Sequence, residues 1–414
     1  MKNYFKKIIS SLAFAILIVN VNAQGSWTQK ASLMNFNGRE DATGFSIGHY
    51  GFIGTGLTSS GYENDFWKWN QTNNTWDSIA HYPGAGKYGV TSFTINGKGY
   101  SCLGYSGSAN ATDLWEYDTT TNSWTQKANF PGAARYGAFV FVLGHKAYIG
   151  CGEPNGPPYD QDVWVYDANA NTWTQKANFP GGIRTSLCAF ALKGYGYAGC
   201  GWDHSSVHND MWKYDTTTNT WTSVAPFPIT PGVSAPVSFV LDSIAYVGTG
   251  NNEFTGKVTR DFWSYSSTTN TWTSIATLTG VGRWTGVGFA IGNKGYAGTG
   301  YDSTNAYLQD YWEYFSCSDT TNNITGISSI VKQTGEINVY PNPNNGNFTL
   351  VLSGTSDKST VEVYNMLGDQ VFTYNLALGN NSMEMSSQPN GIYLYRVISE
   401  TGNLVGQGKM IIQK

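Results

Sequence analysis

The sequence predicts an all-β protein: a six-bladed β-propeller closed by a strand from the N-terminal end, followed by a small C-terminal β-sandwich. Three observations predict this fold. A six-residue motif recurs six times, at intervals of 48 to 50 residues. The chain holds 49 Gly, 15 Trp and 27 Tyr but only 13% charged residues, a composition typical of turn-rich β structure. Finally, the phrase that ends each repeat also stands near the start of the chain, as "GSWTQKASL" from Gly25.

The first 23 residues are expected to be a Sec signal peptide. Three lysines precede an apolar run over residues 8–21, and a small residue, Ala23, follows it. The run is too interrupted by polar residues for a membrane anchor, and no other segment is long and apolar enough to span a bilayer. A net charge of -4 lacks the positive footprint of a nucleic-acid-binding protein. We therefore expect an exported protein with no transmembrane segment and no nucleic-acid partner.

The repeat occupies residues 24–316, and each copy predicts four antiparallel strands. Copies begin with "GFIGTG" at Gly51 or a close variant, and continue with an Asp two residues before a Trp, as in "DFWKW". A second Trp follows nine residues after the first in five copies. Glycine-containing turns separate the strands within each copy. Four antiparallel strands that recur at this period form one propeller blade.

The sixth copy, which contains Trp312, lacks the second Trp and hence its fourth strand. The unpaired phrase around Trp27 supplies that strand from the other end of the chain. Pairing of the two ends would close the ring and remove the open edges that an unclosed array would expose. The Trp and Tyr repeats are interpreted as residues that pack the blades.

These glycines, the spaced Tyr and Trp, and the period near 50 resemble the kelch repeat, over about residues 27–316. The sequence departs from the usual adjacent Gly-Gly, because it has Gly-x-Gly or a single Gly. The resemblance implies a rigid propeller that binds ligands through one face. Kelch propellers include sugar oxidases and sialic-acid mutarotases, and an Arg at the start of an inner strand often contacts acidic ligands in this family.

The composition changes after the repeats. Residues 317–334 are polar and predict a linker, and residues 335–414 alternate short strands with Asn, Gly and Pro, which indicates a small sandwich. Four segments resemble a type A C-terminal sorting domain of type IX secretion cargo. They are "YPNPNNG" from Tyr340, "VYNMLGDQV" around Gly368, "GIY" from Gly391 and the last six residues. This resemblance implies that the type IX secretion machinery is a partner, with passage across the outer membrane. It also implies removal of the tail, so that the product is secreted or attached to the outer surface.

The loops between the second and third strands of the blades are long and dissimilar, so they predict a binding face. Twelve residues before each motif stands a cation in five of six copies, and Val233 breaks the series. We predict that these five residues surround the channel mouth and bind carboxylate or sulfate groups; they are Arg39, Lys87, Arg135, Arg184 and Arg283. The alternative is a bridge from each cation to a neighbouring backbone or to the repeated Asp. Three of them are followed by an aromatic residue: Tyr88, Tyr136 and Trp284.

Aromatic residues in the long loops are the second set of candidates. Their apolar faces suit stacking on sugar rings; the candidates are Tyr62, Tyr105, Tyr159, Trp202 and Tyr301. Together the two sets favour a binding module for an extracellular glycan or an acidic peptide. The sequence leaves open a carbohydrate-active enzyme of the mutarotase or oxidase kind, and a structural or adhesion role at the surface.

No catalytic residue, metal or cofactor is assigned. Several acids lie near the predicted face without a spacing that singles one out; they are Glu40, Glu153, Asp203, Glu253 and Asp302. His204 and His208 form an H-x-x-x-H pattern in a loop, which is more often solvated than metallated. The five Cys are an odd number with no metal-ligand spacing, and three of them occupy strand positions typical of packing residues.

Overall fold

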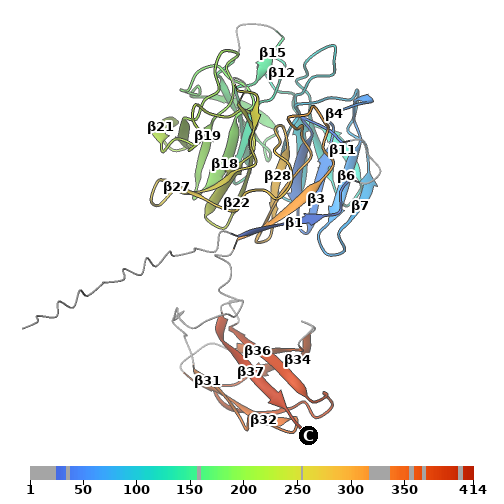
Figure 1. Ribbon diagram of the computed structural model, residues 1–414, viewed down its shortest axis with the longest axis vertical. Helices are drawn as coiled ribbons and strands as arrows, with labels where there is room; N and C mark the ends of the chain where they lie inside the picture. The colour runs from blue at the N-terminus through green and yellow to red at the C-terminus, as the bar shows by residue number, and fades with distance from the viewer. Residues whose placement is uncertain are drawn as a thin grey trace, which may run out of the picture. The chain divides into compact units, whose positions relative to one another are not determined.

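The computed structural model describes residues 25–33, 38–155, 160–252, 255–316, 336–353, 359–365, 370–399 and 404–414. It divides the chain into two compact units, Met1–Asn323 and Ile324–Lys414 (Figure 1). The predicted signal peptide and linker lie outside the described residues, so the domain limits given above stay predictions.

Within the described residues, the first unit contains six four-stranded antiparallel sheets, the blades of the predicted propeller. Blade one comprises β2 (Thr43–Ile47), β3 (Tyr50–Gly54), β6 (Phe66–Asn70) and β7 (Thr75–Ile79). Blade two comprises β8 (Thr91–Ile95), β9 (Lys98–Cys102), β10 (Leu114–Asp118) and β11 (Ser123–Gln126). Blade three comprises β13 (Phe139–Leu143), β14 (Lys146–Gly150), β16 (Val163–Asp167) and β17 (Thr172–Lys176).

The remaining blades follow the same order. Blade four comprises β18 (Cys188–Leu192), β19 (Tyr195–Gly199), β20 (Met211–Asp215) and β21 (Thr220–Val224). Blade five comprises β22 (Val237–Leu241), β23 (Ile244–Gly248), β26 (Phe262–Ser266) and β27 (Thr271–Ser274). Blade six comprises β28 (Val287–Ile291), β29 (Lys294–Gly298), β30 (Tyr311–Phe315) and β1 (Ser26–Lys30). Short two-residue strands lie in the loops: β4 (Leu57–Thr58), β5 (Gly61–Tyr62), β12 (Arg135–Tyr136), β15 (Glu153–Pro154), β24 (Asn251–Asn252) and β25 (Lys257–Val258).

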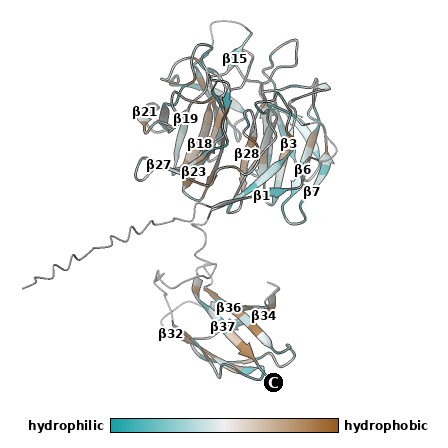
Figure 2. Ribbon diagram, in the orientation of Figure 1, coloured by the Kyte–Doolittle hydropathy of each residue, from teal (hydrophilic) through white to brown (hydrophobic). Residues whose placement is uncertain are grey.

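Burial falls from the inner to the outer strands of a blade. In the innermost strand β28 every second residue is buried, whereas most of the outermost strand β7 is exposed. Figure 2 shows the same gradient, with β28 brown and β7 teal. Because side chains alternate across a strand, each inner strand presents an apolar row to the next blade.

The small first residue of the repeated motif makes room for this packing. A Cβ at Gly51 would lie 2.4 Å from the ring of Phe289, and one at Gly99 would lie 2.3 Å from Phe45. Each of these Phe residues lies on the innermost strand of the preceding blade. A larger side chain at the motif would therefore push neighbouring blades apart.

The N-terminal strand closes the ring, as the sequence predicted. β1 pairs antiparallel with β30, and Trp27 lies opposite Tyr314; the dark blue β1 is labelled in Figure 1. The indole of Trp27 packs 4.7 Å from the ring of Phe262, and its Nε1 donates to the carbonyl of Ala276 in blade five at 2.9 Å. The repeated Trp of the other five blades makes the same bond to the preceding blade. Blade six is therefore joined to its neighbour as every other blade is.

The last glycine of each motif joins its blade to the following one. Each has a φ between +90° and +104°, a conformation that favours glycine, and its N–H donates to a carbonyl of the next blade. In the six pairs, Gly56 donates to Lys87, Gly104 to Arg135, Gly152 to Arg184, Gly201 to Val233, Gly250 to Arg283 and Gly300 to Arg39. The last bond, at 2.7 Å, links blade six to blade one and completes the ring.

The second unit is a sandwich of two sheets. One sheet has the order β31 (Glu336–Tyr340), β32 (Asn347–Ser353) and β35 (Gly379–Glu384). The other has the order β34 (Gln370–Leu376), β33 (Ser359–Tyr364), β36 (Gly391–Ser399) and β37 (Leu404–Ile412). Residues such as Leu350, Val361 and Met410 from both sheets form one apolar core.

Two Asn residues of the "YPNPNNG" segment form hydrogen bonds with the last strand of this sandwich. Asn342 donates from Nδ2 to the carbonyl of Lys409 and accepts from the N–H of Ile411. Asn344 is buried and exchanges backbone hydrogen bonds with Ile411 and Gln413. The motif therefore fixes the last strand of the chain.

Substituting Trp27→Ala should weaken closure of the ring. The side chain is 7% exposed and contacts two blades, so its loss should lower the free energy of unfolding by about 3–5 kcal/mol. Denaturant unfolding of the exported protein measures this change. Gln29→Ala, an exposed residue of the same strand, is the control and should change stability by less than about 0.5 kcal/mol. Equal effects of the two substitutions would contradict closure by Trp27.

Candidate functional site

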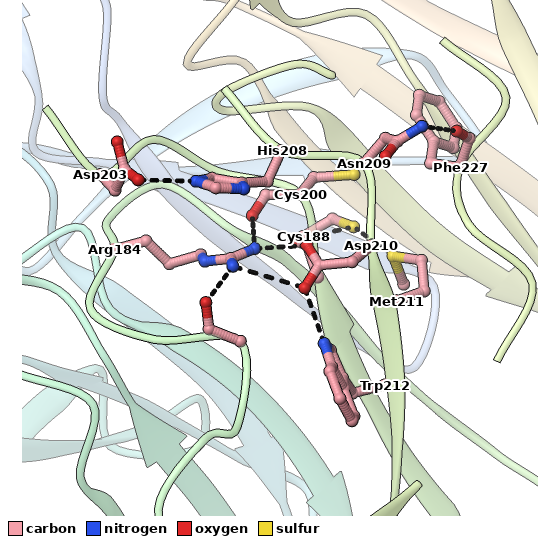
Figure 3. Close-up of polar contacts among 12 residues, drawn as sticks. Arg184, Cys188, Cys200, Asp203, His208, Asn209, Asp210, Met211, Trp212 and Phe227 are labelled. Atoms are coloured by element: carbon pink, nitrogen blue, oxygen red, sulfur yellow. Dashed lines mark hydrogen bonds and ion pairs between the residues drawn. The ribbon is translucent and has the colours of Figure 1, made fainter. Parts of the chain in front are cut away.

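The five predicted cations lie at the starts of the blades, and each pairs with the Asp that precedes Trp in its own blade. The shortest nitrogen–oxygen distances are 2.6 Å for Arg39–Asp65, 2.6 Å for Lys87–Asp113, 2.5 Å for Arg135–Asp162, 2.5 Å for Arg184–Asp210 and 2.7 Å for Arg283–Asp310. Figure 3 shows the pair in blade four, where Arg184 also donates to the carbonyl of Cys200 and Trp212 donates to Asp210.

This geometry corrects the prediction that the five cations surround the channel mouth. Arg135 and Arg283 are 0% exposed, and the least buried of the five, Lys87, is 6% exposed. A guanidinium that donates both terminal nitrogens to a carboxylate has its charge compensated inside the blade. The structure therefore gives these residues the alternative role, an ion pair with the repeated Asp.

The ion pairs lower the pKa of two of these aspartates. Burial alone would raise the pKa of Asp65, but hydrogen bonds from Arg39 and Trp67 hold that pKa below its usual value. The same balance, with Arg283 and Trp312 as donors, lowers the pKa of Asp310. These carboxylates therefore stay charged and paired over the physiological range.

Blade five shows how the blade is completed without a cation. Val233 is buried where the other blades have Arg or Lys. Its aspartate, Asp261, instead accepts from the hydroxyl of Thr259 at 3.2 Å. In the part of the chain that the structure describes, Trp263 Nε1 has no hydrogen-bond partner, whereas the equivalent Trp of each other blade donates to its Asp.

The residue that follows each of these positions forms the wall of a central funnel. In each blade it bridges to the loop after the second strand; the pairs are Glu40–Leu57, Tyr88–Tyr105, Tyr136–Glu153, Thr185–Trp202, Ser234–Asn251 and Trp284–Tyr301. Most of these residues line a cavity of about 380 Å³. Its full lining is Glu40, Asp41, Leu57, Tyr62, Tyr88, Tyr136, Glu153, Thr185, Ser186, Trp202, Ser234, Trp284 and Thr285.

The residue that directly follows each wall residue lies in the throat of the funnel, and each of the six blades contributes one. These residues all have φ between +47° and +64°; they are Asp41, Gly89, Gly137, Ser186, Ala235 and Thr285. Each of the last five donates its N–H to the carbonyl of the preceding one, at 2.8 to 3.3 Å. They line a second cavity of about 140 Å³ below the first. The throat is thus a backbone ring in which blade one contributes a carboxyl side chain.

The predicted loop aromatics separate into three groups. Tyr62 and Trp202 line the cavity. Tyr105 lies behind it, with its ring 5.6 Å from that of Tyr88, and Tyr301 lies 6.3 Å from Trp284. Tyr159 falls outside the described residues. Two of the five candidates are therefore brought together at the funnel.

Three aromatic residues of the wall were noted in the sequence only because they follow cations. Tyr88, Tyr136 and Trp284 line the cavity directly, and the ring of Tyr88 lies 5.1 Å from that of Tyr136. Burial raises the pKa of Tyr88 to about 12, so its phenol stays protonated and can donate a hydrogen bond. Their constant position, one residue after the cation, was the signal that could have selected them.

The charge of the funnel is acidic. Its lining contains Glu40, Asp41 and Glu153 but no Lys or Arg. Burial and the negative charge of Glu40 raise the pKa of Asp41 to about 8, and burial raises the pKa of Glu40. Asp41 was not among the predicted site residues, because the other blades place small or hydroxyl residues at the same step.

The remaining polar clusters of the described residues do not form a metal centre. No three His, Cys, Asp or Glu come together in a ligating group within that part of the chain. His208 bonds to Asp203 at 2.8 Å (Figure 3), and His204 lies 3.5 Å from Glu153. The thiols of Cys102, Cys151, Cys188 and Cys200 are free and buried.

The fold and this funnel define a closed six-bladed propeller with a concave funnel at one end. Residues 131–294 match the KLHDC2/KLHL20/DRC7 Kelch-repeats domain, and residues 338–413 match the secretion system C-terminal sorting domain. Among solved structures, "Structure of YjhT" is 17% identical, with a TM-score of 0.57, over 66% of this chain and 94% of that chain. This likeness shows the fold. No curated protein matches the chain in sequence.

The chain therefore carries a kelch propeller and a sorting domain of the type IX secretion system, which confirms both resemblances. The sorting domain marks the protein for export to the cell surface or the medium. None of the described segments is a helix able to cross a bilayer.

Replacing Arg135 by Val should destabilise blade three, because Asp162 would then keep its charge without a buried partner. The expected loss in the free energy of unfolding is about 3–5 kcal/mol. The double substitution Arg135→Val and Asp160→Thr copies the Val233 and Thr259 arrangement of blade five and should recover part of this loss. Chemical denaturation of the three proteins measures it. Unchanged stability of the single variant would show that the pair is not structural.

Substituting Asp41→Asn should make stability less dependent on pH. The folded-state pKa of about 8 lies above the ordinary value of 3.8, so the folded wild type holds a proton that the unfolded chain releases. Wild-type stability should therefore decrease as the pH rises from about 4 to about 8, by at most ~1.4 kcal/mol per pH unit. Thermal unfolding across this range measures the change. The stability of the variant relative to wild type should increase as the pH rises. A difference that is constant with pH would contradict the raised pKa.

Proposed function

We propose that the propeller is an extracellular carbohydrate-binding module whose site is the funnel. The observation that carries this proposal is the lining of the cavity. Five aromatic residues from five different blades meet there; they are Tyr62, Tyr88, Tyr136, Trp202 and Trp284. Aromatic faces pack on the apolar faces of sugar rings, while phenol, indole and carboxylate groups bond to hydroxyls.

The size and rigidity of the funnel support this function. A volume of about 380 Å³ falls in the range of small-ligand sites. The throat bonds and the closing Gly300–Arg39 bond fix the backbone under the wall, so little ordering is needed on binding. Export to the surface or the medium would bring the funnel into contact with extracellular glycans.

The acidic ligands considered from the sequence have lost their support. Their expected contacts were the five cations, which are buried and paired. An acidic peptide would instead meet Glu40 and Glu153 in the cavity, where like charges repel. A neutral or positively charged glycan agrees better with this lining.

Removing aromatic faces from the funnel should weaken glycan binding without unfolding the protein. A glycan array identifies the bound class, and titration calorimetry then compares wild type with Trp202→Ala and Trp284→Ala. Each substitution should weaken binding about fivefold or more, since stacking contributes about 1 kcal/mol or more.

The control is Tyr195→Ala. Tyr195 is 37% exposed and begins β19 at the opposite end of its blade from the funnel. This variant should bind as tightly as wild type. Full affinity in both Trp variants, or no glycan bound by the wild type, would rule out the funnel as a carbohydrate site.

A further inference from the structure

The funnel lacks a positive charge opposite its acids. Glu40 and Asp41 come from blade one and Glu153 from blade three, while no Lys or Arg is among the lining residues. Tyr136 is hydrogen-bonded to Glu153, and His204 Nε2 lies 3.5 Å from Glu153 Oε2. The Arg and Lys residues beneath the wall are already paired with their aspartates.

Like the carboxylates, the aromatic residues of the lining attract positive charge. The face of an aromatic ring carries partial negative charge and attracts cations, with or without a carboxylate nearby. Tyr88 and Tyr136 stand on adjacent blades with ring centroids 5.1 Å apart, and Trp202 and Trp284 line the same cavity from two further blades. Rings together with carboxylates form a site suited to a cation.

The raised pKa of Asp41 agrees with this interpretation. The pKa is raised because burial and the negative charge of Glu40 both disfavour the ionised form of Asp41. A bound cation would supply the missing favourable interaction and let Asp41 ionise.

The base of the cavity also has an unused hydrogen-bonding group. Thr285 lines both the funnel and the throat and is 8% exposed. Its hydroxyl has no hydrogen-bond partner among the described residues, although a buried polar group normally has one. This hydroxyl is therefore available to a ligand that reaches the throat.

We propose that the funnel selects glycans that carry free amino groups, with the ammonium group held among Glu40, Asp41 and Glu153 and the sugar rings against the aromatic wall. This inference rests on the proposed carbohydrate-binding function and specifies its ligand class. A basic peptide is less well suited. The cavity of about 380 Å³ is compact, and its size suits a small ligand better than an extended chain.

The test is titration calorimetry of the exported protein with four trimers: glucosamine, N-acetylglucosamine, galacturonate and lysine. The two amino-sugar probes differ only in the acetyl groups that remove the positive charge. Glucosamine trimer should bind at least tenfold more tightly than its acetylated form, and galacturonate and lysine trimers should bind weakly or not at all.

Two substitutions in the funnel assign the preference to its acids. Glu40→Gln and Glu153→Gln should each weaken glucosamine binding about tenfold and weaken N-acetylglucosamine binding by a smaller factor, because Gln keeps the hydrogen bonds and loses the charge. Asp242→Asn is the control. Asp242 is exposed in the β22–β23 hairpin, at the end of blade five opposite the funnel, so loss of its charge should have no effect on binding.

The outcomes separate the two proposals. Equal binding of the two amino-sugar probes, or tighter binding of galacturonate, overturns the selectivity and leaves the carbohydrate site. Lysine trimer bound as tightly as glucosamine trimer overturns the glycan assignment in favour of a basic peptide. An absence of binding to any glycan, here and on the array, overturns the carbohydrate-binding function itself.

Discussion

The structure depends on one backbone hydrogen bond that is repeated at every junction between blades. The last glycine of each motif adopts a left-handed conformation and donates to the carbonyl of the first residue of the next blade. That carbonyl belongs to the buried cation in five blades and to Val233 in the other. The bond therefore fixes, in one place, the neighbouring sheet, the ion pair beneath the funnel and the wall residue that follows.

Three consecutive residues at each blade start consequently have three different environments. In blade two, Lys87 is buried against Asp113, Tyr88 lines the cavity and Gly89 joins the throat. The charge at the first position is paired with a partly buried carboxylate, so it cannot also serve a ligand. The chemistry of the funnel depends on the second position, on loop residues such as Glu153 and Trp202, and on Asp41, the one carboxyl side chain in the throat ring.

The repeat period and chemistry were sufficient to predict most of the fold. The spacing of the motifs gave six blades, and the missing Trp after Trp312 gave the closing role of Trp27, because both are counts along the chain. The direction of the Arg and Lys side chains was not predictable, since spacing locates a residue at a strand start without showing which way its side chain turns. The sequence did contain one indication. Blade five, which has Val233 in place of the cation, is the only blade with a Thr two residues before its repeated Asp, and the hydroxyl of this Thr259 donates to Asp261 in place of the cation. Glu40 and Glu153 were among the acids expected near the predicted face, but they are far apart in sequence, so their shared place in one cavity could not be singled out before the ring brought them together.

The position of the closing strand has a consequence for maturation of the protein. In the described part of the chain, no residue after Phe315 belongs to any of the six blades. A ring closed by a C-terminal strand would place its last joint beside the sorting domain. Here the joint is made by Ser26–Lys30, so proteolysis beyond Ser316 would detach the sorting domain and leave every blade with its full set of strands.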